Sequence, residues 1–111
     1  MITIVGCDEE FGPQVFKIDP SGSAMGYKAL ATGSKEQEAT TQLERAFRKN
    51  DGQWNAKQAV EVAIKTLSTV VSSDFRASEI EVAISTVAQP LFKKLSEEEI
   101  ETVLNEMADA M

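Results

Sequence analysis

Apolar residues alternate with polar or small residues in the first third of the chain, a pattern that is typical of β-strands. Residues 2–7 form a short run rich in β-branched side chains, residues 14–18 form a second run, and residues 23–31 form a third with small side chains. Asp19-Pro20-Ser21-Gly22 has the composition of a tight turn between the second and third runs. Such short connections predict an antiparallel meander of three strands.

Helical spacing follows in the middle of the chain. Ser34, with Gln37 three residues later, has the pattern of a capping box at the start of a first helix. Asn50-Asp51-Gly52 is expected to end that helix, because glycine readily adopts the left-handed conformation of a helix C-terminus. The apolar stripe between these signals is narrow and consists of Ala39, Leu43, Ala46 and Phe47.

A second helix is predicted in the following segment. Asn55 and Gln58 open it, and Ser72-Ser73-Asp74 ends it. Its apolar stripe is wide and follows the three-to-four-residue spacing for four turns. The members of this stripe are Ala56, Ala59, Val60, Ala63, Ile64, Leu67, Val70 and Val71. We expect the buried residues that pack this helix against the sheet to be Val60, Ile64, Leu67 and Val71.

The last third predicts two more strands and a third helix. Residues 80–85 alternate as a half-buried strand, Gln89-Pro90 breaks it, and residues 91–95 form a shorter, lysine-bearing partner at an edge. Ser96 and Glu99 form a capping box for the last helix. Its expected buried face consists of Ile100, Val103, Leu104, Met107, Ala108 and Met111. The whole chain, residues 1–111, is therefore expected to be a single α+β domain with the order βββ-αα-ββ-α.

Composition narrows the function classes. Eleven basic and 18 acidic residues give a net charge of −7, which argues against nucleic acid or an anionic membrane as the main partner. No apolar run approaches the roughly 20 residues of a membrane span. The sequence has no histidine, which excludes Ser-His-Asp and Cys-His catalysis. It has a single cysteine, which excludes an internal disulfide framework. Residues 96–111 hold six acidic and no basic side chains, which we interpret as a solvated helix face.

The residues that carry chemistry have structural interpretations. Cys7 lacks an activating base and is interpreted as a structural cysteine in a strand. Glu97-Glu98-Glu99 suit the first turn of a helix better than a metal site, because consecutive helical side chains diverge. Gly33-Ser34 is only a weak anion-site pattern, and Trp54 fits a hydrophobic staple better than ligand stacking. No catalytic, cofactor-binding or metal-binding residue is predicted.

Several segments resemble the α-type subunits of the proteasome. Residues 6–22 contain G-x-D-E-x-x-G-P-Q followed by D-P-S-G, which is specific to a strand pair of that family. Residues 33–39, with Leu43-Glu44, resemble the start of the helix that follows. Residues 95–100 match its closing L-[ST]-x-x-E-I helix. The segments that most resemble the alpha type-6 class, which occupies the α1 ring position, are 67–75 and 78–82.

The resemblance implies an αββα sandwich of the N-terminal nucleophile hydrolase type, of which this chain resembles only the C-terminal half. It implies a fragment, a truncated gene product or a shortened transcript. The implied function is that of a non-catalytic structural subunit of the outer α ring of the 20S core particle, which contributes to gating and ubiquitin-dependent protein degradation in cytoplasm and nucleus. The implied partners are neighbouring α subunits, the β ring and regulatory particles, without a cofactor.

Catalysis in the β-type relatives uses an N-terminal threonine, and the half that carries it has no counterpart here. Ser34 and Asp74 lie near positions that match polar supports in those relatives, and we interpret both as structural. An alternative function is an independent acidic protein-interaction module that uses the C-terminal helix. A threonine-type hydrolase is the third hypothesis.

Overall fold

The N-terminal part of the chain folds as an antiparallel meander. The computed structural model describes residues 2–72, 75–89 and 91–109. Its elements are β1 (Ile2–Asp8), β2 (Gly12–Ile18), β3 (Ala24–Tyr27), α1 (Glu36–Asn50), α2 (Ala56–Val71), the 3-10 turn η1 (Ala77–Glu79), β4 (Ala83–Ile84), β5 (Lys93–Lys94) and α3 (Glu97–Asp109). One sheet has the order β1-β2-β3, and β4 pairs with β5 in a second sheet. The structure therefore has the expected order βββ-αα-ββ-α, with η1 added.

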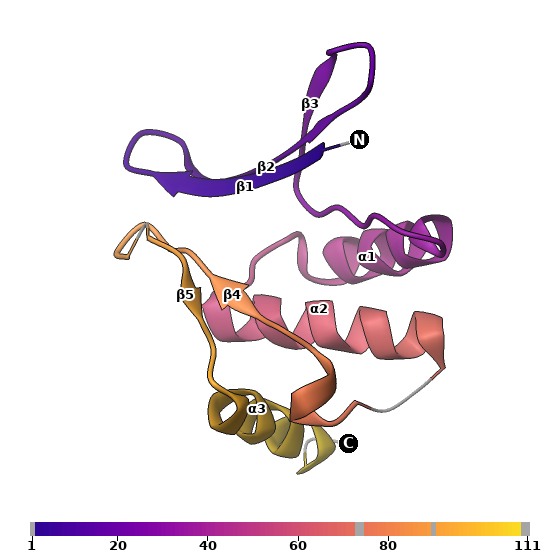
Figure 1. The fold of residues 1–111 in the computed structure, drawn as a ribbon, viewed down its shortest axis with the longest axis vertical. Helices are drawn as coiled ribbons and strands as arrows, with labels where there is room; N and C mark the ends of the chain where they lie inside the picture. The colour runs from indigo at the N-terminus through magenta and orange to yellow at the C-terminus, as the bar shows by residue number, and fades with distance from the viewer. Residues whose placement is uncertain (1, 73–74, 90, 110–111) are drawn as a thin grey trace.

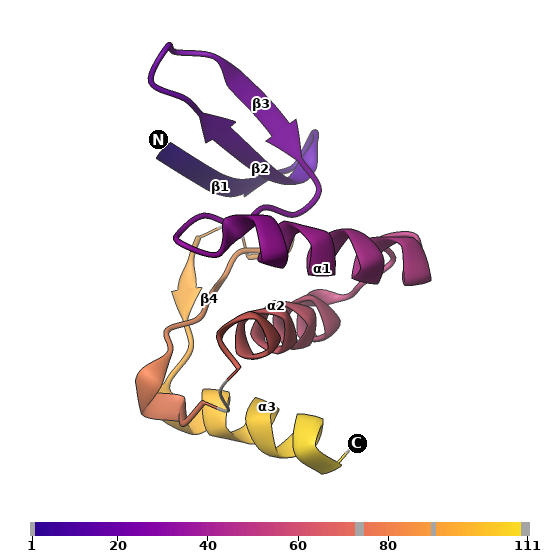
Figure 2. The same ribbon diagram turned by 90° about the vertical axis from the view of Figure 1, so that its right-hand side faces the viewer.

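The helices stack in layers at one end of the three-stranded sheet. In both views α2 lies between α1 and α3, and the β4–β5 segment runs along one side of this stack (Figures 1 and 2). The β1–β2–β3 sheet extends away from α1 in the opposite direction to α3. The element with neighbours on most sides is therefore α2.

The turn between β2 and β3 is held by one carboxylate. The Asp19 carboxylate accepts hydrogen bonds from the Ser21 backbone N–H at 3.0 Å, the Ser21 hydroxyl at 2.6 Å and the Ser23 N–H at 3.1 Å. The Gly22 N–H closes the turn on the Asp19 carbonyl at 3.0 Å. These hydrogen bonds, that of the Ser21 hydroxyl first, lower the pKa of the Asp19 carboxyl. The turn predicted at residues 19–22 is confirmed.

Two helix N-termini carry reciprocal side-chain caps. The Gln58 N–H donates to Asn55 Oδ1 at 2.8 Å, and the Asn55 N–H donates to Gln58 Oε1 at 3.0 Å. At α3 the Glu99 N–H donates to Ser96 Oγ at 3.1 Å, and the Ser96 N–H donates to Glu99 Oε1 at 3.0 Å. Both starts agree with the sequence prediction, because each pair satisfies backbone donors that the helix leaves free.

The capping box predicted at Ser34 is wrong. The first helix begins at Glu36 after Lys35, and no side chain caps it. The Glu36 N–H donates to the Gly33 carbonyl at 3.3 Å, so Ser34 lies inside a turn. A capping residue needs an extended backbone at the helix boundary, and Ser34 is too early in the chain to supply it.

Aromatic packing fixes the connection between α1 and α2. Asp51 and Gly52 both adopt left-handed conformations, with φ of 52° and 69°. The ring of Phe47 occupies the space that a Cβ atom on Gly52 would need. Trp54 packs edge-to-face on Phe47 with ring centroids 6.2 Å apart. The expected helix end at residues 50–52 is confirmed, and Trp54 supports the helical hairpin from the side of α2.

The buried core is small. Among the described residues, only Ile64, Val70 and Ile100 are buried hydrophobic side chains. Two side chains expected in the core are instead solvent-exposed: Leu67 is 46% exposed and Val71 is 42% exposed. The periodicity placed them correctly on the apolar face of α2, but that face is wider than the elements that cover it. Their predicted burial is therefore wrong for this chain.

The strands of the last third are shorter than predicted. The strand expected over residues 80–85 pairs only at Ala83–Ile84, and its partner only at Lys93–Lys94. One further backbone bond, from the Leu95 N–H to the Val82 carbonyl at 2.8 Å, extends the contact. A turn at residues 86–89 closes immediately after β4, so the ladder has no room to lengthen in that direction.

Burial predicts different costs for two truncations on α2. We expect Ile64→Ala to destabilise the chain by about 2–5 kcal/mol, because it leaves a cavity in the core. Leu67→Ala is expected to cost less than about 1 kcal/mol, because its side chain already contacts solvent. Urea unfolding followed by circular dichroism measures both. Equal losses for the two variants would contradict the burial described above.

The Glu99 cap predicts a dependence on acid. Hydrogen bonds from the Ser96 backbone and from Lys93 lower the pKa of Glu99. Its contribution to stability is therefore complete above its ordinary pKa and is lost as the pH falls through the lowered value in the folded state. We expect Glu99→Gln to flatten the fall in stability between about pH 5 and 3. The control Glu101→Gln removes an equal charge from α3, and an identical flattening there would contradict the assignment.

Candidate assembly interface

Cys7 and Ser34 lie in separate elements. Cys7 is a half-buried free cysteine in β1, and Ser34 is exposed in the turn before α1. Asp74 lies outside the described residues. Cys7 thus lies in the strand predicted for it, whereas Ser34 lies in a turn and not at the helix cap expected of it.

One residue of the acidic first turn of α3, Glu99, makes two kinds of side-chain contact. Glu99 caps the helix and also accepts a hydrogen bond from Lys93 Nζ at 3.2 Å. Within residues 2–72, 75–89 and 91–109, no three His, Cys, Asp or Glu side chains gather closely enough to hold a metal ion. In the same ranges no helix has the length and apolarity needed to cross a bilayer.

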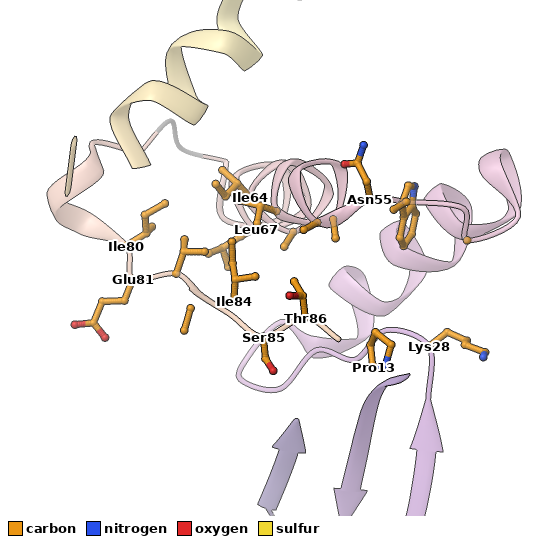
Figure 3. A pocket seen from close by; sticks show the side chains of 18 of the residues that line it. Pro13, Lys28, Asn55, Ile64, Leu67, Ile80, Glu81, Ile84, Ser85 and Thr86 are labelled. Atoms are coloured by element: carbon orange, nitrogen blue, oxygen red, sulfur yellow. The ribbon is translucent and has the colours of Figure 1, made fainter. Parts of the chain in front are cut away.

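A groove of about 740 Å³ separates α2 from the β4 segment (Figure 3). We call it the α2–β4 groove. Ile64 and Leu67 line it from α2, and Ile80 and Ile84 line it from the other wall. Pro13 of β2 and Lys28, which follows β3, bring the end of the three-stranded sheet to the rim of the groove. The exposure of Leu67 follows from this geometry, because the groove is open where a core would be filled.

A second groove of about 740 Å³ lies between α2 and α3. Leu104 and Met107 contribute apolar side chains from α3, while α2 contributes Val62. An ion pair joins the two helices, with Lys57 Nζ 2.7 Å from Glu106 Oε2. This hydrogen bond to Glu106 raises the pKa of Lys57. The exposed Lys57–Glu106 ion pair thus links α2 and α3 where the apolar packing between these helices is incomplete.

Both faces of the three-stranded sheet are open to solvent. Ile2 and Ile4 are exposed on one face of β1, and Val5 is exposed on the opposite face because side chains alternate along a strand. Outside β1, the exposed large hydrophobic side chains of the described residues are Phe11, Met25, Tyr27, Leu67, Val71, Val87, Leu91 and Phe92. Sequence periodicity missed the exposed apolar residues near β4 and β5, although Leu91 and Phe92 follow directly on the strand break at Gln89-Pro90.

The total solvent-accessible surface of the chain is larger than expected for a folded monomer of its mass. The chain exposes 8265 Å² at a mass of 12.1 kDa. A folded monomer of that mass exposes roughly 6000 Å². The excess, about 2000 Å², is comparable to the total area that a stable protein–protein interface buries. The geometry therefore favours assembly with other polypeptide over chemistry at an enclosed site.

Comparison with known proteins identifies the class. A family model described as "Proteasome subunit" matches residues 1–85, and the chain belongs to this family. The α+β class and the N-terminal nucleophile hydrolase type of fold implied by the resemblance are thereby confirmed.

The relatives are α-type subunits. The chain is 38% identical over 108 residues to "Probable proteasome subunit alpha type-1" of Schizosaccharomyces pombe and 32% identical over 108 residues to "Proteasome subunit alpha type-6" of Caenorhabditis elegans. It is 29% identical over 94 residues to "Proteasome subunit alpha" of Methanobrevibacter smithii. These alignments cover 97%, 97% and 85% of this chain. They cover 44%, 44% and 36% of the relatives, so the chain spans less than half of their length. The resemblance to proteasome α-type subunits is confirmed.

The purified chain is predicted to lack peptidase activity. The sequence has no histidine, and the single thiol is the half-buried Cys7 in a strand. We expect no release of fluorophore from peptide substrates and no labelling by a covalent threonine-directed inhibitor. An assembled 20S particle serves as the positive control. Turnover that survives removal of contaminating β subunits would contradict the prediction.

Proposed function

We propose that this chain serves as a non-catalytic structural part of the outer α ring of the 20S proteasome. The observation that carries the proposal is the 38% identity to an α-type relative across 97% of the chain. Because the resemblance extends over nearly the whole chain, the proposal concerns the chain as a whole and not one segment of it.

The open apolar surfaces support an assembly role. The α2–β4 groove has apolar side chains on both walls, including Leu67 and Ile84, and it lies next to the end of the sheet. An apolar groove that remains open in one chain gains stability when another polypeptide fills it. In this proposal the partners are the remaining part of an α-type subunit, the neighbouring α subunits and the β ring.

At the finer level we propose that the assembled ring contributes to gating, docks regulatory particles and takes part in ubiquitin-dependent protein degradation in cytoplasm and nucleus. These roles belong to an assembly and need no catalytic group on this chain.

The alternative of an independent acidic module receives less support from α3. Glu99 is used in the helix cap, and Glu106 is paired with Lys57. Ile100 on the same helix is buried. Part of the charge and part of the apolar face that a partner would recognise are thus already engaged within the chain.

Incorporation into a particle tests the proposal. When the tagged chain is co-expressed with a complete set of α- and β-type subunits, we expect a fraction to sediment with the high-mass particle. Leu67→Glu would place a carboxylate in the α2–β4 groove and is expected to reduce that fraction by about tenfold, because an unpaired charge resists burial.

The matched control is Leu91→Glu, which makes the same change at an exposed leucine that does not line this groove. Its incorporation is expected to equal that of the parent chain. Absence of the parent chain from every high-mass fraction would overturn the proposal. Equal incorporation of the Leu67→Glu chain and its parent would remove the α2–β4 groove from the interface.

A further inference from the structure

The loop between α1 and α2 contains an aspartate that is followed directly by a glycine. Asp51-Gly52 is the one Asp-Gly pair of the sequence, which has no Asn-Gly pair. In such a pair no side chain shields the glycine nitrogen, and glycine leaves the backbone beside it free to rotate. Asp51 is exposed, so water reaches its carboxyl group. The pair therefore has the groups needed for a reaction in which the backbone attacks the neighbouring side chain.

This reaction joins the two residues in a cyclic imide. The Gly52 nitrogen bonds to Cγ of the protonated Asp51 carboxyl, and the amide proton leaves with the carboxyl hydroxyl as a water molecule. Another water molecule then adds to either imide carbonyl carbon and breaks the bond from that carbon to nitrogen. Opening at Cγ restores aspartate, whereas opening at the former backbone carbonyl gives isoaspartate, whose main chain runs through Cβ and Cγ. Water is the only co-reactant.

The folded loop holds the two reacting atoms apart. Asp51 has φ of 52° and ψ of 32°. At this ψ the Gly52 nitrogen lies nearly opposite Cβ of Asp51 across the Cα–C bond, because the substituents of an L-residue are about 120° apart around that bond. Ring closure requires the nitrogen and Cβ to lie on the same side of the bond. The main chain must therefore rotate at Asp51 before the imide can form.

Hydrogen bonds and aromatic packing oppose this rotation. The Gly52 N–H donates to the Phe47 carbonyl at 3.1 Å, and the Asp51 N–H donates to the same oxygen. The Phe47 ring fills the space beside Gly52 and packs edge-to-face on Trp54. All of these contacts are made within residues 47–54, so the resistance to rotation is local to the helical hairpin.

We propose that Asp51-Gly52 is a latent isomerisation site, which the α1–α2 hairpin protects and which converts to isoaspartate when the hairpin opens. Isoaspartate adds an atom to the main chain and removes the left-handed residue that ends α1. The N–H groups of residues 51 and 52 then no longer converge on the Phe47 carbonyl. Conversion therefore makes a transient opening of the hairpin permanent. This inference goes beyond the proposed function and does not depend on it.

Peptide mapping after prolonged incubation of the purified chain at neutral pH tests the proposal. A protease that cleaves before aspartate but not before isoaspartate, followed by mass spectrometry, measures the isoaspartate fraction at position 51. We expect this fraction to rise at least about tenfold faster in urea than in buffer, because only the opened molecules of the folded chain react. Asp19 is the internal control, because the nitrogen of Pro20 carries no proton and cannot form the imide. Absence of isoaspartate at position 51 in urea, or equal rates in urea and in buffer, would overturn the proposal.

Two substitutions test the protection under folding conditions. Trp54→Ala removes the ring that packs on Phe47 and is expected to speed isoaspartate formation in buffer at least about threefold. The matched control Tyr27→Ala removes an aromatic side chain from β3 and is expected to leave the rate unchanged. Circular dichroism verifies that both variants keep their helices, and Trp54→Leu replaces Trp54→Ala if that variant does not. An unchanged rate in the folded Trp54 variant would contradict protection by the hairpin.

The isolated product tests the permanence of the opening. The isoaspartate form, separated from the parent chain by chromatography, is expected to have less helical circular dichroism and a lower Tm. Equal helical signal and equal Tm for the two forms would overturn the claim that conversion keeps the hairpin from closing.

Discussion

The need to cover apolar surface with another element is the constraint on which the rest of this structure depends. A sheet has two faces and a helix has one broad apolar stripe, and each must meet another element to leave water. Here α2 is the element with neighbours on most sides, and its Ile64 and Val70 are two of the three buried hydrophobic side chains among the described residues. On β1, Ile4 and Val5 are exposed on opposite faces of the sheet, so neither face is covered there by the described residues.

Features set by neighbours in the sequence were predictable. Asn55 and Gln58 are three residues apart, and their reciprocal hydrogen bonds depend only on the geometry of the first helical turn. The turn at Asp19 likewise depends on groups within four residues. The wrong prediction of a capping box at Ser34 is also a local one. The helix starts later than expected, and a displacement of one residue is enough to remove the cap.

Features set by distant elements were not predictable from spacing. Leu67 has the same periodic position as Ile64, yet one is exposed and the other is buried. Periodicity identifies which face of a helix is apolar, but not whether this chain or another one covers it. For that reason the α2 residues that line the α2–β4 groove have the sequence pattern of an ordinary buried core. The absence of a predicted catalytic residue followed from composition, whereas the position of the α2–β4 groove required the arrangement of the elements.

The Phe47–Gly52 contact has a consequence for sequence variation in the helical hairpin. Any side chain at position 52 meets two independent penalties, one from the left-handed backbone and one from the aromatic ring. Relieving the collision by moving Phe47 would disturb its packing with Trp54, so a substitution at one position demands compensation at two others. The angle between α1 and α2 is thus linked to a residue without a side chain, and related sequences that replace this glycine must reach their hairpin by a different turn.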